Sequence, residues 1–136
     1  MSSANTDPPT RLRVVVVGPC ASGKSTLVER LIAAGFDAYV CSQEHSEIAT
    51  LWQHLGPDAV IALDVDLATI RARRGEDWPD TIYQEQRRRL VAAWKAADII
   101  IDTSITSADE TFALAVDALM HRETNRDVAG SPYPCS

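Results

Sequence analysis

Short apolar runs alternate with longer amphipathic stretches along most of the chain. The short runs have the length of strands, and they lie at residues 13–17, 38–42, 59–63 and 98–101. In the longer stretches, apolar residues recur every three or four positions, which is the period of a helix with one buried face. This pattern predicts helices over residues 25–34, 46–55, 67–74, 82–96 and 108–120.

The alternation of strands and helices is typical of α/β folds in which a parallel sheet is covered on both faces. We therefore expect a three-layer α/β sandwich with a mostly parallel, four-stranded sheet. Right-handed crossovers would place the carboxyl ends of the strands along one edge, where such sheets bind ligands. This domain should span residues 11–121, and the polar, proline-containing segments 1–10 and 122–136 should be flexible tails.

Composition narrows the range of partners. The chain has 136 residues and a net charge of −6 at neutral pH, which is a poor match for a nucleic-acid backbone. No apolar run approaches the roughly 20 residues of a membrane-spanning helix, and residues 1–13 lack the apolar stretch of a secretory signal. We therefore expect a cytoplasmic protein with no nucleic-acid or membrane partner. The three cysteines lack metal-site spacing and should be free thiols, and exposed sheet edges would allow a homodimer.

The most specific motif follows the first apolar run. Residues 18–26 read GPCASGKST, which matches the Walker A pattern in its required context between a strand and a helix. Such a loop turns its backbone amides inward, and the positive end of the helix dipole adds to the attraction for phosphate. Lys24 would contact the terminal phosphates, and the Ser25 hydroxyl would bind Mg²⁺. The expected phosphate-binding residues are Gly18, Pro19, Cys20, Ala21, Ser22, Gly23, Lys24, Ser25 and Thr26.

With this loop the chain resembles the P-loop NTPases, and two further stretches are similar to their nucleoside and nucleotide kinase branch. In residues 60–74, a strand ending in Leu63-Asp64 leads to an arginine-rich helix, as in the lid of thymidylate and deoxynucleoside kinases. The long helix at 82–96 is followed by a last strand and helix, as in those kinases. The Asn-Lys-x-Asp signature of GTPases is absent from the sequence. The resemblance implies a small, truncated P-loop fold that binds ATP with Mg²⁺ and phosphorylates an unidentified small-molecule acceptor.

The resemblance also directs attention to the segment after the second strand. Those kinases have five core strands, whereas the sequence predicts four, and a gap before the third would place the second strand beside the first. Residues 43–46 (Gln-Glu-His-Ser) would then lie near the γ-phosphate, where the resemblance implies an acidic residue that holds Mg²⁺ or acts as a base. Glu44 is the candidate for this role. Alternatively, the segment is a polar loop in which Ser46 caps the next helix.

Two further carboxylates end predicted strands. Asp64 follows an apolar strand, as a Walker B aspartate does, and is the alternative metal ligand, although the arginines after it mark that strand as the one leading to the lid. Asp102 occupies a similar position, and residues 102–104 would otherwise contact the base of the nucleotide.

Arginines on a mobile segment can neutralise the charge that develops during phosphoryl transfer. Arg71 and Arg74 are three residues apart and share a helix face, whereas Arg73 points elsewhere, so the first two are candidate catalytic residues. Residues 87–89, all arginine, are secondary candidates. The alternative is a solvated helix surface on which these arginines pair with nearby carboxylates.

The sequence thus favours a phosphotransferase, with two alternatives. A chain lacking one strand and helix of its relatives could be a non-catalytic nucleotide-binding or sensing module. It could also be a simple NTP hydrolase that needs no acceptor. No stretch identifies the acceptor.

Overall fold

The computed structural model describes the backbone of residues 12–129 and the side chains of residues 12–122. The expected tail at residues 1–10 lies outside the described residues, as do residues 130–136 of the other tail. The strands are β1 (Arg13–Val17), β2 (Asp37–Val40), β3 (Ala59–Asp64) and β4 (Ile99–Asp102). The helices are α1 (Lys24–Ala33), α2 (Leu67–Arg74), α3 (Asp80–Ala96) and α4 (Ala108–Ala129), with 3₁₀ turns η3 (Gln43–His45) and η4 (Leu51–Leu55).

The four strands form one sheet in the order β2-β1-β3-β4, and every pair is parallel. The expected α/β class is confirmed, as is the expected pairing of the second strand with the first. The connection from β1 to β2 runs one way along the sheet, whereas those from β2 to β3 and from β3 to β4 run the other way. The direction therefore reverses between β1 and β3, and the carboxyl ends of strands at such a reversal are where open α/β sheets bind ligands.

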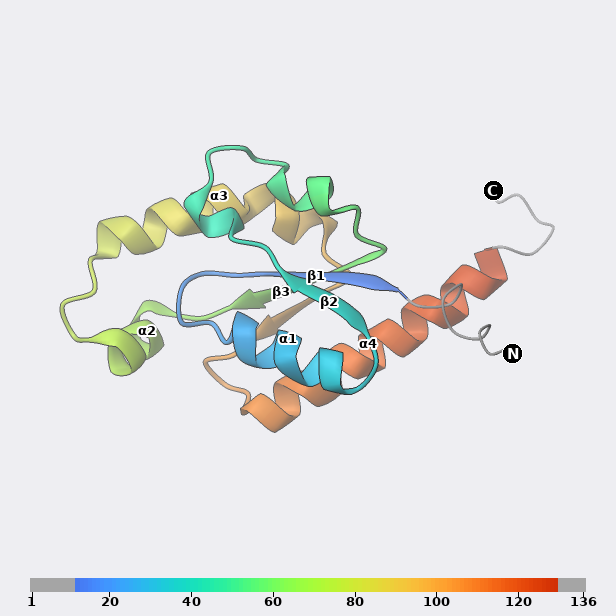
Figure 1. Ribbon diagram of the computed structural model, residues 1–136. Helices are drawn as coiled ribbons and strands as arrows, with labels where there is room; N and C mark the ends of the chain where they lie inside the picture. The colour runs from blue at the N-terminus through green and yellow to red at the C-terminus, as the bar shows by residue number, and fades with distance from the viewer. Residues whose placement is uncertain (1–11, 130–136) are drawn as a thin grey trace.

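Helices cover both faces of this sheet (Figure 1). Val14 and Val16 of β1 face the layer formed by α1 and α4, where they pack with Leu31. Val15 and Val17 face the opposite layer, formed by α3 and η4. The apolar run of β1 is therefore continuous because both of its faces are buried. This arrangement is compatible with the expected three-layer sandwich.

The predicted helix at residues 46–55 is wrong, because only the short 3₁₀ turn η4 forms there. The buried side chain of Gln43 explains the difference. Its Nε2 donates to the carbonyl oxygen of Ile48 at 2.7 Å, and its Oε1 accepts from the backbone amide of Trp52 at 3.0 Å. These bonds satisfy backbone groups that an α-helix would have paired internally. The Trp52 side chain packs in the core.

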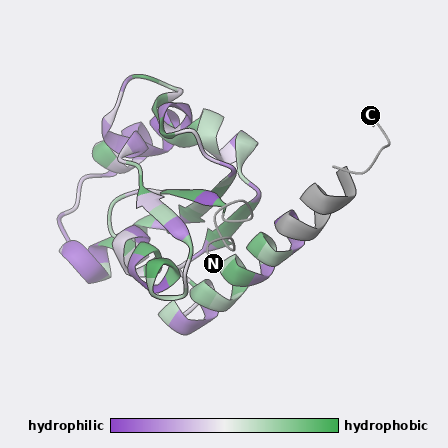
Figure 2. Cartoon of the chain, turned by 45° about the vertical axis from the view of Figure 1, so that its right-hand side comes forward, coloured by the Kyte–Doolittle hydropathy of each residue, from purple (hydrophilic) through white to green (hydrophobic). Residues whose placement is uncertain are grey.

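One helix differs from expectation in extent. Helix α4 continues past Met120 to Ala129, so residues 122–129 are helical where a tail was expected. Helix α2 lies beyond the carboxyl ends of the strands and is largely hydrophilic (Figures 1 and 2). It is anchored by Ile70, which packs with Val65 and Tyr83.

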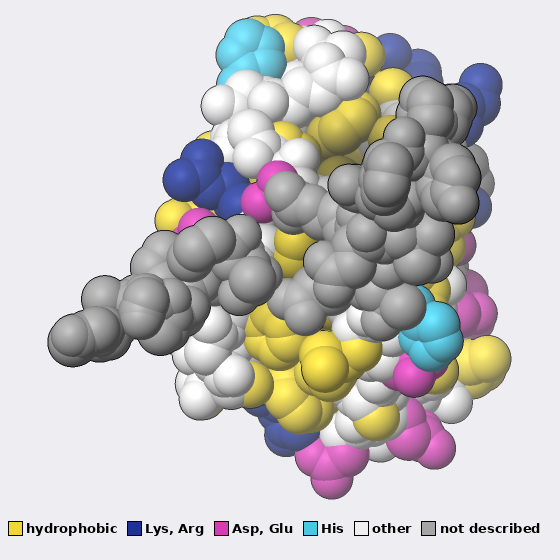
Figure 3. All heavy atoms as spheres, turned by 90° about the vertical axis from the view of Figure 1, so that its right-hand side faces the viewer, with side chains coloured by type: hydrophobic (Ala, Val, Ile, Leu, Met, Phe, Trp, Pro, Cys, Tyr) yellow, Lys and Arg dark blue, Asp and Glu magenta, His cyan; other side chains and the backbone are white. Residues whose placement is uncertain are grey.

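The opposite end of the molecule carries acidic, basic and hydrophobic side chains interspersed on one face (Figure 3). Among the described residues, no helix combines the length and the apolar character that crossing a membrane requires.

Candidate functional site

The glycine-rich loop (residues 18–23) joins β1 to α1 at the reversal point of the sheet. Gly18 lies against β3, where an added Cβ would meet the carbonyl oxygen of Leu63 at 2.8 Å and the Oγ of Ser22 at 2.6 Å. Gly23 precedes α1 with a φ of 97°, in the left-handed region that favours glycine. Both glycines of the motif therefore occupy positions that a larger residue would disturb.

Helix α3 fixes the middle of this loop. Gln86 accepts a hydrogen bond from the backbone amide of Cys20 at 3.0 Å, and its Nε2 donates to the Cys20 sulfur at 3.2 Å. Ala21 has a φ of 64°, which is uncommon for a residue with a Cβ. The Oγ of Ser22 is buried and has no hydrogen-bond partner in the described part of the chain. The loop thus has a non-glycine residue with positive φ and a buried hydroxyl oxygen without a partner among the described residues.

The ammonium of Lys24 lies at the start of α1 and is almost completely enclosed. It donates to the carbonyl oxygens of Gly18 and Pro19 at 2.8 and 2.9 Å, and it lies 2.9 Å from Oε2 of Glu44. An ammonium has three donors, so these contacts occupy all of them. A phosphate bound to this lysine would therefore have to replace at least one of the three.

Glu44 reaches the loop from η3, just beyond β2, in the region expected from the sequence. Its side chain is 4% exposed, and its second carboxylate oxygen, Oε1, has no hydrogen-bond partner among the described residues. The neighbouring His45 places Nε2 3.6 Å from Glu44 Oε2 and 3.6 Å from the Cys20 sulfur. No α-helix begins at Ser46, and its hydroxyl instead accepts a hydrogen bond from the amide of Ile48 at 3.0 Å within a turn.

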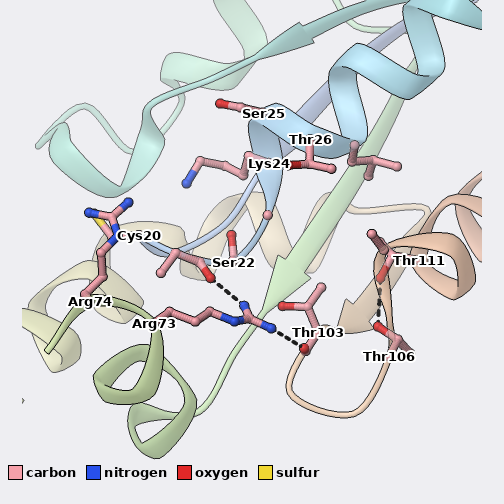
Figure 4. Close-up of a pocket in the computed structure, with 14 residues that line it drawn as sticks. Cys20, Ser22, Lys24, Ser25, Thr26, Arg73, Arg74, Thr103, Thr106 and Thr111 are labelled. Atoms are coloured by element: carbon pink, nitrogen blue, oxygen red, sulfur yellow. Dashed lines mark hydrogen bonds between the residues drawn. The ribbon is translucent and has the colours of Figure 1, made fainter. Parts of the chain in front are cut away.

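A cavity of about 460 Å³ opens beside the loop (Figure 4). Its walls come from the loop, the first turn of α1, the end of α2 and the segment from β4 to α4. The hydroxyl-bearing residues Ser25 and Thr26 line it, whereas the Lys24 ammonium extends away from Thr103 and Thr111 on the far wall. A volume of this size suits a small-molecule ligand.

Two of the three arginines of α2 line the cavity, but they are not the pair expected from helical spacing. Arg73 and Arg74 line the cavity. Arg73 donates to the carbonyl oxygens of Ala21 at 2.6 Å and Thr103 at 2.9 Å, so it bridges the loop and the β4–α4 segment. The Nε of Arg71 instead donates to the carbonyl oxygen of Trp78 at 3.0 Å, which closes the turn after α2. Helical spacing could not predict that Arg73 lines the cavity, because its partners are backbone carbonyls from two distant segments.

The carboxylate of Asp64 is engaged by α3. Its Oδ1 accepts from the Nη1 of Arg87 at 2.6 Å and from the amide of Val65 at 2.8 Å, and the Arg87 guanidinium lies 4.7 Å from the ring centre of Trp94. Among the described residues, one group of three or more Cys, His, Asp or Glu side chains lies close enough to share an ion, and it contains Glu44 but not Asp64. Asp102 is also used locally, since its Oδ1 accepts from the amide of Ser104 at 2.9 Å.

The remaining arginines of α3, Arg88 and Arg89, form ion pairs with Glu47 in the segment that carries Glu44. We call this group of ion pairs the clamp. Arg88 and Arg89 lie 3.0 and 2.7 Å from the two carboxylate oxygens of Glu47, and both also pair with Glu85. The hydrogen bonds from Arg88 and Arg89 lower the pKa of Glu47 below its usual value. Arg89 further donates to the carbonyl oxygen of Glu44 at 3.3 Å. These arginines therefore position Glu44 through its backbone and its neighbour.

One buried thiol lies near this segment. Burial raises the pKa of Cys41, which follows β2, so its thiol stays protonated at neutral pH.

No family model matches the chain, and a search of curated proteins found no similar sequence.

Proposed function

We propose that the chain is a small P-loop protein, similar to nucleoside and nucleotide kinases, that binds ATP with Mg²⁺ and transfers the γ-phosphate to a small-molecule acceptor. The observation that carries the proposal is the 2.9 Å contact between Lys24 and Glu44 beside the glycine-rich loop. A Walker A lysine and a buried carboxylate, brought together at the carboxyl edge of a parallel sheet, form an arrangement suited to phosphoryl transfer.

The residues around the loop fit a nucleotide. The loop approaches β3 so closely that a Cβ on Gly18 has no room, and the buried hydroxyl of Ser22 and the Oε1 of Glu44 lack partners among the described residues. The adjoining cavity of about 460 Å³ has room for a base or sugar. The Ser25 hydroxyl, at the start of α1, is the expected Mg²⁺ ligand on the loop side.

Each side chain has a proposed part. Lys24 would exchange a carbonyl or carboxylate contact for phosphate oxygens, and Glu44 would hold the Mg²⁺ shell or accept the proton of the acceptor hydroxyl. Arg73 and Arg74 line the cavity, where they would neutralise phosphate charge, and Arg71 would support them through the turn at Trp78. Bound ATP with Mg²⁺ would supply the transferred group, and these residues would supply position and charge.

A non-catalytic nucleotide-binding module is the second candidate. Between β2 and β3 the chain has only the turns η3 and η4, so the region that would build an acceptor pocket is small. All three donors of Lys24 are also satisfied within the protein, so nucleotide binding must displace an existing contact. A simple NTP hydrolase is the third candidate function.

The test is ADP formation from ATP and Mg²⁺, with and without pooled nucleosides, nucleotides and sugars. A kinase forms ADP only with acceptor, a hydrolase forms it without acceptor, and a module binds ATP and releases little ADP. Lys24→Met should abolish ATP binding, whereas Lys95→Met, which alters the other lysine of the chain, should not.

A buried, unpaired Glu44 could destabilise the Lys24→Met variant, so the double variant Lys24→Met/Glu44→Gln serves as its folded control, checked by circular dichroism. Full ATP binding by the folded double variant would overturn the proposal. Glu44→Gln alone should keep ATP binding and lose at least about a hundredfold in transfer, the usual contribution of an acid–base group.

A further inference from the structure

Three side chains of different chemistry meet where the glycine-rich loop touches η3. They are the thiol of Cys20, the carboxylate of Glu44 and the imidazole of His45. The sulfur and the Glu44 Oε2 are each 3.6 Å from the His45 Nε2. One ligand atom from each residue lies within 4.8 Å of the other two.

The two separations at the His45 Nε2 are those of a metal's coordination shell. In a tetrahedral zinc site, bonds of about 2.3 Å to sulfur and about 2.0–2.1 Å to nitrogen or oxygen place neighbouring ligand atoms roughly 3.3–3.6 Å apart. Both 3.6 Å separations therefore need little or no adjustment. Thiolate, imidazole and carboxylate are the three protein ligand types of zinc, and three protein ligands leave a fourth position open.

A second feature, on the same Glu44 carboxylate, favours a bound cation. The Glu44 side chain is 4% exposed, yet its Oε1 has no hydrogen-bond partner within the part of the chain that the structure describes. A buried carboxylate oxygen without a partner is costly, and a cation is the partner it favours. The His45 side chain is 58% exposed, so an ion can enter from solvent on that side.

The supporting contacts hold two of the ligands in place before any ion arrives. Gln86 binds both the backbone and the sulfur of Cys20, and Arg89 binds the carbonyl oxygen of Glu44. Such outer contacts orient metal ligands and raise metal affinity.

We propose that Cys20, Glu44 and His45 form a binding site for a thiophilic divalent cation of the Zn²⁺ class. On binding, the Cys20 thiol gives its proton to solvent and its sulfur bonds the metal. The cation and the ammonium of Lys24 both use the Glu44 carboxylate, so they compete for it. The site requires neither nucleotide nor acceptor, and it therefore goes beyond the proposed function.

The test uses the full chain, freed of metal, with Zn²⁺ titrated against a chromophoric chelator and Co²⁺ as a spectroscopic probe. Cys20→Ala and His45→Ala should each weaken Zn²⁺ binding at least about tenfold, since even the loss of a supporting contact costs that much. Bound Co²⁺ should show a thiolate-to-metal charge-transfer band that Cys20→Ala removes. The matched controls Cys41→Ala and His54→Gln should leave Zn²⁺ affinity within about twofold of the unaltered chain.

His45→Ala separates this proposal from the proposed function. It should lose Zn²⁺ affinity but keep ATP binding, because His45 is exposed and has no part in the proposed function. Equal Zn²⁺ affinity in the unaltered chain, Cys20→Ala and His45→Ala would overturn the metal site. A Co²⁺ complex whose thiolate band survives in Cys20→Ala would also overturn it, because another cysteine would then be the ligand.

Discussion

The ammonium of Lys24 lies 2.9 Å from the carboxylate of Glu44, and both side chains are at least nine-tenths buried. One residue begins α1 and the other lies in η3, so the pair joins the glycine-rich loop to the segment beyond β2. A charge in such surroundings is strongly destabilising without its partner. The pair therefore links the stability of the domain to the residues of the candidate site.

Removing one member of this pair should be much worse than removing both. Lys24→Met should lower the free energy of unfolding by about 3–5 kcal/mol, because it leaves the Glu44 carboxylate buried without its cation. Adding Glu44→Gln should recover a large part of that loss, since the amide carries no charge. Urea unfolding of both single variants and the double variant measures the coupling. Strict additivity would show that the pair is not formed in solution.

Among the five glycines of residues 12–129, Gly18 should be the least tolerant of substitution. A Cβ at this position would lie 2.8 Å from the backbone oxygen of Leu63, so β3 would have to move. Gly18→Ala should cost about 1–3 kcal/mol and weaken ATP binding. Gly56→Ala is the matched control, because Gly56 has a φ of 64° but its Cβ would meet nothing closer than 3.5 Å. It should cost about 1–2 kcal/mol and leave ATP binding unchanged; an equal loss of binding in both variants would contradict the prediction.

The sequence predicts the four strands well, because a strand buried on both faces must be a short, continuous apolar run. The glycine-rich loop is equally readable, since all its residues are adjacent in the chain. Glu44 could be assigned to the loop only through strand order, and the observed pairing of β1 with β2 confirms that order. The apolar periodicity at residues 46–55 predicted a helix that does not form, because the side chain of Gln43 binds the backbone groups that the helix would have paired.

Contacts between distant segments could not be predicted from the sequence. Arg73 reaches two backbone carbonyls, and backbone carbonyls carry no residue signature. Asp64 ends a strand as a metal ligand would, but its partner Arg87 comes from α3, 23 positions later. The meeting of Cys20 with His45 likewise depends on how η3 folds against the loop.

Asp64 should act through Arg87 and not through metal. Asp64→Asn and Arg87→Leu should each lower the free energy of unfolding by about 1 kcal/mol, since both groups are about one-third exposed, and the double variant should lose less than the sum. The Mg²⁺ concentration needed for ATP binding should be the same in Asp64→Asn and in the unaltered chain. A clear rise in that concentration would make Asp64 the metal ligand instead.

The clamp between Glu47 and α3 should make stability depend on acidic pH. Hydrogen bonds from Arg88 and Arg89 lower the pKa of Glu47 from its usual 4.5, and Arg88 lowers the pKa of Glu85 in the same way. A carboxylate whose folded pKa is depressed contributes stability above its unfolded pKa, and this contribution is lost as pH falls through the folded pKa. The urea midpoint should therefore fall as the pH drops below about 4.5. Because these groups are exposed, the change should be small and should shrink in high salt.

Glu47→Gln isolates this contribution. The variant lacks the titrating group at the clamp, so its urea midpoint should fall less between pH 5 and pH 3 than that of the unaltered chain. Glu76→Gln is the matched control, since Glu76 is an exposed glutamate in the turn after α2, and it should keep the full pH dependence. Glu47 pairs with Arg89, which also binds the backbone of Glu44, so Glu47→Gln should weaken ATP-dependent activity. The loss should be smaller than in Glu44→Gln, because the Glu44 carboxylate is still present. Identical pH profiles for Glu47→Gln and the unaltered chain would show that the clamp does not form in solution.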